Sequence, residues 1–164
     1  MTLTAHAIVG AGIVAVMPSH PVLGISAAFA SHFLLDAIPH YDYRIRSASV
    51  NPKIGAPMKF DRALLLDFCT IGSDFAVGMV LGIWLFATPA TWWLIAVGAF
   101  FGAFPDALQF AYTRFRYEPL VSLQRFHTWI HTDIRLREHP VLGVTSQILF
   151  LVALVTLAKM FLNL

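Results

Sequence analysis

The sequence predicts an all-α fold: a polytopic membrane helix bundle with about five transmembrane helices and one interfacial helix, in a single domain over residues 1–164. Hydrophobic residues make up 58% of the chain and charged residues only 12%, whereas a soluble domain is about 25% charged. The mean hydropathy is +0.72. The apolar stretches are numerous enough to cross a bilayer several times, so we expect an integral membrane protein.

Two short apolar segments open the chain. Residues 3–17 are rich in Gly and Ala, which favours close packing against a neighbouring helix. Residues 21–38 form a second segment, because Pro21 suits the first turn of a helix and Pro39 stops one. The two segments are expected to form a tight helical hairpin.

Three further apolar segments are long enough to be transmembrane helices, and they cover residues 60–88, 92–110 and 140–162. Between the last two, residues 120–136 mix apolar and charged side chains in the way that an interfacial helix does. The only cysteine, Cys69, lies in an apolar segment, which excludes a disulfide or a thiolate metal cluster within one chain.

Most Lys and Arg residues fall in two polar segments, residues 40–59 and 112–139, while the turns at 17–21 and 86–91 carry none. The positive-inside rule places both basic segments in the cytoplasm. Five spans result, with the N-terminus inside and the C-terminus outside. The formal net charge is only +2, so no nucleic-acid partner is expected. The apolar spans make membrane lipid the expected partner.

This topology brings ionisable side chains from remote parts of the sequence to one depth at the cytoplasmic side. An ionised side chain at the centre of a bilayer helix costs roughly 2.5 to 3.5 kcal/mol, so such groups usually find partners inside the bundle. His32 and Asp36 are four residues apart and share a helix face, and His40 follows Pro39 and can fold back toward them. His127 and His131 have the same four-residue spacing.

Carboxylate oxygen and imidazole nitrogen both coordinate divalent cations, and a cation removes the repulsion between acids. The sequence therefore predicts a divalent metal ion, with Zn²⁺ as the first choice. Its predicted ligands are His32, Asp36, Asp106, His127 and His131, and the predicted catalytic residues are Asp36 and His40. His6 lies at the same depth, as either a sixth ligand or a packed histidine. Other acids have structural alternatives: Asp61 is expected to cap the helix that follows it, and Asp67 and Asp42 are either functional or purely structural.

Four stretches resemble the family of small membrane-bound metal-dependent hydrolases, including the LexA-binding inner-membrane type: "TAHAIVGAGI", "SHFLLDAIPHYD", "GAFFGAFPDALQF" and "HTWIHTD". The resemblance implies metal binding by the matching residues His6, Asp106, His127 and His131, and a place in the bacterial inner (cytoplasmic) membrane. The sequence departs from that family after Asp106, where "ALQF" stands in place of a second Asp and a His. His32, Asp36 and residues 39–42 can supply the missing ligands.

Three functions remain open at this stage. The first is metal-dependent hydrolysis of a phosphate ester or another amphiphilic substrate at the cytoplasmic headgroup level, with arginines available to hold an anionic head, namely Arg114, Arg116, Arg125, Arg135 and Arg137. The second is a structural or assembly protein whose metal ties helices together. The third is a cation or proton transporter in which Asp67 and Asp74 line a path along residues 60–88. The sequence leaves the oligomeric state open.

Overall fold

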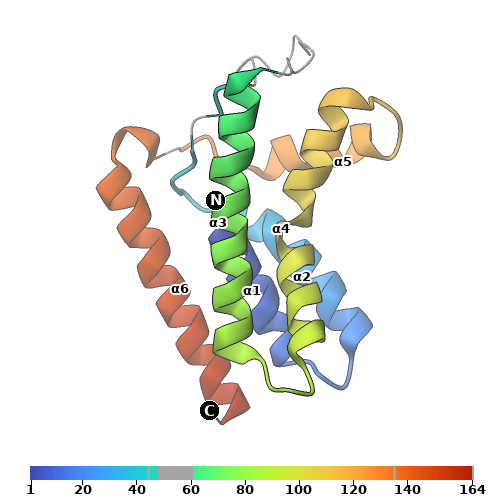
Figure 1. Cartoon of the computed structure of the whole chain (residues 1–164), viewed down its shortest axis with the longest axis vertical. Coiled ribbons are helices and arrows are strands. Elements are labelled where there is room, and N and C mark those ends of the chain that lie inside the picture. Colours follow the sequence, from blue (N-terminus) through green and yellow to red (C-terminus); the bar gives the residue numbers. More distant parts are fainter. Residues whose placement is uncertain (44, 48–60, 135, 164) are drawn as a thin grey trace.

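The computed structural model describes residues 1–43, 45–47, 61–134 and 136–163, which are mostly helical (Figure 1). The elements in chain order are α1 (Leu3–Ala15), α2 (Pro21–Asp36), α3 (Arg62–Phe86), α4 (Trp92–Arg114), α5 (Leu120–Ile130), the short 3₁₀ helix η1 (Leu136–Glu138) and α6 (Pro140–Leu162). The predicted all-α fold is confirmed for these residues. The predicted start of the third apolar segment, residue 60, lies outside the described ranges.

Helix α1 is the centre of the bundle and packs against α2, α3, α4 and α6. Its small side chains explain this position, since Ala5, Ala7 and Ala11 are fully buried. Three glycines allow α1 and α4 to touch backbone to backbone. A Cβ on Gly10 would lie 2.4 Å from the carbonyl oxygen of Gly98, and one on Gly102 would lie 2.4 Å from the carbonyl oxygen of His6. This close packing is what the Gly- and Ala-rich first segment predicted.

The helix ends follow local sequence signals. Pro21 and Pro140 occupy the first turns of α2 and α6, where a missing N–H costs nothing. Asp61 accepts a hydrogen bond from the Leu64 N–H at 3.1 Å, so its predicted role as the N-cap of α3 is confirmed. Helix α2 ends at Asp36, two residues earlier than expected, and the turn before Pro39 brings His40 back toward the helix end.

Three helices, α3, α4 and α6, are long and apolar enough to cross a membrane. Helix α6 is the most apolar of them, and within it only Gly143 and Gln147 are buried. Helices α1 and α2 have 13 and 16 residues, whereas a full crossing takes about 20. The helices thus support a membrane protein, while the five-span arrangement remains a prediction.

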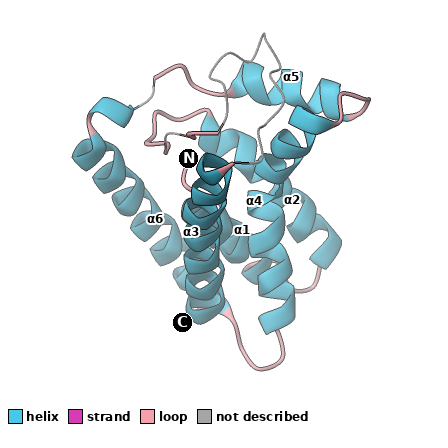
Figure 2. Cartoon of the chain, turned by 45° about the horizontal axis from the view of Figure 1, so that its top comes forward, coloured by secondary structure: helices cyan, strands magenta, loops and turns pink. Residues whose placement is uncertain are grey.

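The two ends of the bundle differ. Figure 1 shows the α1–α2 turn, the α3–α4 turn and the C-terminus at one end, and α5 toward the other end. Figure 2 shows the same separation after the molecule is turned. Helix α5 therefore lies away from the two uncharged turns, and the membrane side that each end faces remains a prediction.

Single cysteines placed in a Cys69→Ser background test this topology. Cysteines at Arg46 and Arg125 are expected to react with an impermeant thiol reagent from one side of the membrane, and cysteines at Ser19 and Pro89 from the other. Labelling of positions 46 and 89 from the same side would contradict the predicted membrane topology. Labelling of position 19 together with position 46 would show that α1 and α2 do not cross.

Candidate metal centre

Asp36, the last residue of α2, is the hub of a buried cluster of imidazoles. Its side chain is only 2% exposed. Oxygen Oδ2 lies 3.2 Å from His32 Nε2 and 3.0 Å from His127 Nε2. Oxygen Oδ1 lies 3.2 Å from His6 Nε2 and 3.8 Å from His40 Nε2. The four imidazoles come from α1, α2, α5 and the segment after α2, so the fold directs remote residues to a single carboxylate.

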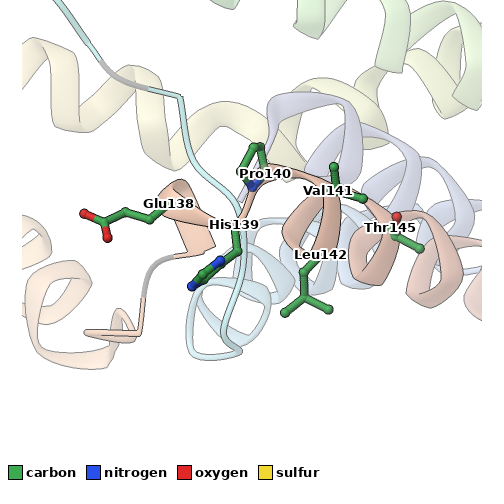
Figure 3. A pocket seen from close by; sticks show the side chains of 6 residues that line it. All are labelled: Glu138, His139, Pro140, Val141, Leu142 and Thr145. Atoms are coloured by element: carbon green, nitrogen blue, oxygen red, sulfur yellow. The ribbon is translucent and has the colours of Figure 1, made fainter.

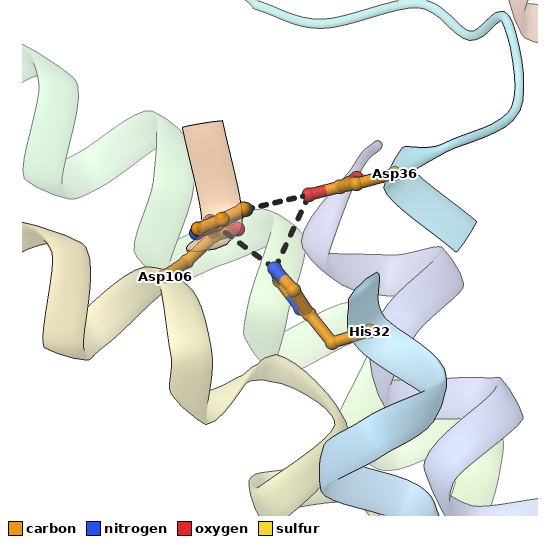
Figure 4. Close-up of side chains that lie close together, drawn as sticks. His32, Asp36 and Asp106 are labelled. Carbon is orange, nitrogen blue, oxygen red and sulfur yellow. Dashed lines mark hydrogen bonds and ion pairs between the residues drawn. The ribbon is translucent and has the colours of Figure 1, made fainter. Parts of the chain in front are cut away.

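Asp106 completes this arrangement from α4, as Figure 4 shows together with His32 and Asp36. It follows Pro105 inside the helix, and its Oδ1 lies 3.5 Å from His32 Nε2. At 34% its side chain is much more exposed than that of His32, which is fully buried. The cluster therefore reaches the protein surface at Asp106.

One group of donor atoms has the spacing of a metal site. His32, Asp36, Asp106 and His127 each offer a donor atom, and these four atoms lie within 4.8 Å of one another. Two ligands of a tetrahedral Zn²⁺, each bonded at about 2.0 to 2.1 Å, stand about 3.3 Å apart. The separations of 3.0, 3.2 and 3.5 Å around His32 and Asp36 match this value.

The tautomer of His32 favours a cation in this place. His32 Nδ1–H donates to the carbonyl oxygen of Gly102 at 3.0 Å, and a carbonyl cannot donate, so Nδ1 carries the ring proton. The neutral ring then presents a lone pair at Nε2 toward the oxygens of Asp36 and Asp106. Within the described residues this buried Nε2 has no hydrogen-bond partner. A metal ion between Nε2 and these oxygens would satisfy it, and the Gly102 carbonyl would then be the outer partner that orients the ligand.

A second group consists of Asp36, His40 and His131, whose donor atoms also lie within 4.8 Å of one another. His40 Nδ1–H donates to the Ile38 carbonyl at 2.6 Å, and His131 Nδ1–H donates to the Thr132 carbonyl at 2.9 Å. Both rings therefore direct Nε2 into the cluster. This differs from the expectation that His127 and His131 share a helix face, because α5 ends at Ile130 and His131 has extended backbone.

Asp42 lies beside the second group, and it is one of the residues 39–42 that the sequence offers as further ligands. Its Oδ1 is 3.0 Å from His40 Nε2, and its Oδ2 is 4.0 Å from His131 Nε2. Burial would raise the pKa of the Asp42 carboxyl, but the amino group of Met1, 3.2 Å from Asp42 Oδ1, acts to lower this pKa. Burial lowers the pKa of His131, which favours the neutral ring that a ligand needs. Proximity to His40 in the sequence was the signal for Asp42.

Two further groups contact Asp36. His6 is fully buried and stacks on His32 with the ring centroids 3.9 Å apart. Neither of its ring nitrogens has a hydrogen-bond partner in the described part of the chain. The amino nitrogen of Met1 lies 2.5 Å from Asp36 Oδ1 and 3.2 Å from Asp42 Oδ1. The structure thus brings all six predicted metal ligands to one place, four of them in the first donor group, His131 in the second, and His6 against Asp36.

The two acids of α3 have other partners. Asp67 Oδ2 accepts the backbone N–H groups of Arg46 at 2.8 Å and Ser47 at 2.7 Å. Asp74 accepts from the Thr4 N–H at 2.9 Å and from the hydroxyl of Tyr43. Burial and the hydrogen bond to Asp74 raise the pKa of that hydroxyl. These contacts hold the segment after α2 and the start of α1 in place around the cluster.

The predicted arginines are distributed around the same end. Arg137 Nη2 lies 3.7 Å from Asp42 Oδ2, and Arg114, Arg116 and Arg125 are exposed. Arg135 lies outside the described residues. A surface hollow of about 580 Å³ at the start of α6, lined by Glu138, His139, Pro140, Val141, Leu142 and Thr145 (Figure 3), includes no member of the cluster.

No protein-family model, curated protein or solved structure matches this chain. The function of this chain is therefore inferred from the geometry of the cluster and from the nature of its donor atoms.

Proposed function

We propose that this protein is a membrane-embedded, metal-dependent hydrolase that acts on an amphiphilic phosphate ester at the cytoplasmic headgroup level of the bacterial inner membrane. The observation that carries the proposal is the buried Nε2 of His32, which lacks a hydrogen-bond partner among the described residues and faces Asp36 and Asp106. His32, Asp36 and His127 hold one ion, with Zn²⁺ as the first choice. Three ligands leave an open position, which is the pattern of a catalytic zinc site.

Two groups have separate roles in the proposed hydrolysis: the metal ion as a Lewis acid and Asp106 as a general base. When bound, the metal supplies Lewis acidity and lowers the pKa of water toward neutrality. Asp106 lies at the exposed side of the site, where it takes a proton from the attacking water as a general base. Hydrolysis forms a bond from the water oxygen to phosphorus and breaks the ester P–O bond, and the departing alcohol receives the proton.

The surroundings favour a lipid-like substrate. Helix α5 directs His127 into the cluster, while Phe126 and Trp129 on the same helix are 43% and 77% exposed. Aromatic side chains of this kind sit at the headgroup level of a bilayer. Arg137, next to Asp42, is the arginine placed to meet an anionic head.

The test combines zinc content with phosphate release from phosphatidate micelles, prenyl phosphates and a chromogenic phosphomonoester. Asp106→Asn is expected to keep the zinc and to lower phosphate release by at least about 100-fold, the usual contribution of a general base. The wild-type protein without bound zinc, or with zinc and no turnover on any of these esters, would contradict the proposal.

One observation favours a second candidate function, a metal that only ties the helices together. The first donor group has four members from α2, α4 and α5, and a closed four-coordinate site is the structural type. In that case Asp106→Asn would lose the zinc and lower the unfolding temperature. The same variant therefore separates the two functions.

A further inference from the structure

The two donor groups share one residue, Asp36, and each uses a different oxygen of it. Oxygen Oδ2 faces His32 and His127, at 3.2 and 3.0 Å, whereas Oδ1 faces His40 at 3.8 Å. We propose that Asp36 bridges two divalent cations, the second of which is bound by Asp36, His40 and His131. The proposal rests on the proposed function for the first ion and adds a site of its own.

His40 is the main evidence for the second ion. The residue is fully buried, and in the part of the chain that the structure describes its Nε2 has no hydrogen-bond partner. Because Nδ1–H donates to the Ile38 carbonyl, the Nε2 of a neutral His40 ring would present a lone pair to Asp36 and Asp42. Oxygens of both carboxylates lie within 3.8 Å of this nitrogen. Lone pairs facing one another in a buried place call for a cation between them.

Backbone hydrogen bonds hold the segment that contains His131 against the end of α2. The Thr132 N–H donates to the Asp36 carbonyl oxygen at 2.9 Å, and the Leu136 N–H donates to the His40 carbonyl oxygen at 3.0 Å. These bonds fasten the segment after α5 to the end of α2, so the rings of His40 and His131 lie 5.0 Å apart. The donor atoms are thus arranged by main-chain contacts that need no metal to form.

The charge at this place suits a divalent ion. Asp36 and Asp42 are both carboxylates with side chains only 2% and 15% exposed, and His40 and His131 present neutral donor atoms. A buried carboxylate is costly unless a positive group faces it. The Met1 amino nitrogen and Arg137 supply part of that charge, and a second cation beside His40 Nε2 and His131 Nε2 would supply the rest.

A two-ion centre narrows the class of substrate. Two cations about 3.5 to 4 Å apart are the arrangement that stabilises the attacking and the leaving oxygen of a phosphoryl group. The bridged centre therefore favours phosphate esters over carboxylic esters as substrates.

The number of bound ions tests the proposal on the full chain in detergent. After loading with Zn²⁺ and removal of free metal, elemental analysis is expected to give about two ions per chain for the wild type and about one for His131→Ala. His40→Gln should give the same loss, which guards against a folding defect in either variant. His139→Ala, which changes an exposed histidine outside the cluster, is the matched control and should keep both ions.

Loading with Mn²⁺ provides a second readout, because two bridged ions give an exchange-coupled electron paramagnetic resonance signal, whereas isolated ions do not. The wild type is expected to show coupling and His131→Ala to lose it. One ion per wild-type chain, or two ions in both His131→Ala and His40→Gln, would overturn this proposal and leave the proposed function standing. No bound ion in the wild type would overturn both.

Discussion

Replacing Asp36 with Asn is expected to remove the bound metal and all activity that depends on it. Asn keeps the size of the side chain but loses the charge, and this one carboxylate faces imidazoles from four segments. Even residues that only orient a ligand change metal affinity by about 10- to 100-fold, so the loss of the shared ligand should exceed about 100-fold. Zinc affinity, measured by competition with a chelating dye, checks the expectation.

The matched control is Asp133→Asn, which removes the same charge from an exposed position in the segment after α5. It should bind zinc as the wild type does. Zinc affinity within a factor of a few of wild type in Asp36→Asn would show that the carboxylate is not a ligand. The contacts of Asp36 would then be a hydrogen-bonded network that joins the helices.

Gly102→Ala is expected to cause a large loss of stability, because the added methyl group meets backbone atoms of a neighbouring helix. The new Cβ would lie 2.4 Å from the carbonyl oxygen of His6 and 3.1 Å from the Cα of Gly10. Neither atom can move without its helix, so α1 and α4 must separate. Overpacking of this kind costs about 1 to 3 kcal/mol or more in free energy of unfolding, which thermal unfolding in detergent would measure.

The metal site should fail together with the packing. The Gly102 carbonyl of α4 accepts the Nδ1–H of His32, and His6 of α1 stacks on His32. Separation of α1 from α4 therefore disturbs the contacts that hold His32. Gly72→Ala is the control, since a Cβ there meets nothing within 4 Å and Ala is the better helix former by about 1 kcal/mol. Equal stability of the two variants would contradict the packing described for α1 and α4.

The helices could be predicted because their limits depend on local signals. Pro21 and Pro140 begin helices where a missing N–H is tolerated, and Asp61 caps α3 with its own side chain. Pro105 did not interrupt α4, and the helix continues to Arg114, four residues beyond the expected end. Tertiary packing around Gly102 and Ala103 supports the helix at that point, and no local pattern encodes such packing.

The sequence predicted that the site residues lie at one depth in the bundle, but it did not predict which side chains contact one another. The alternation of basic and uncharged turns predicted that the ionisable groups lie at one end of the bundle. In the structure, His32, Asp36 and His127 do contact one another. Helical spacing failed for His131, because α5 stops one residue before it and the ring turns to His40 instead. Helical spacing also could not predict the partners of Asp74, because Thr4 and Tyr43 come from remote segments.

Anomalous X-ray diffraction at the zinc absorption edge, from crystals of the zinc-loaded protein, tests the central claim most directly. The account predicts a peak among α2, α4 and α5, within about 2.0 to 2.2 Å of His32 Nε2, His127 Nε2 and Asp36 Oδ2. No peak in this cluster at saturating zinc, with His32 and His127 bonded directly to the Asp36 carboxylate through ring N–H groups, would contradict it.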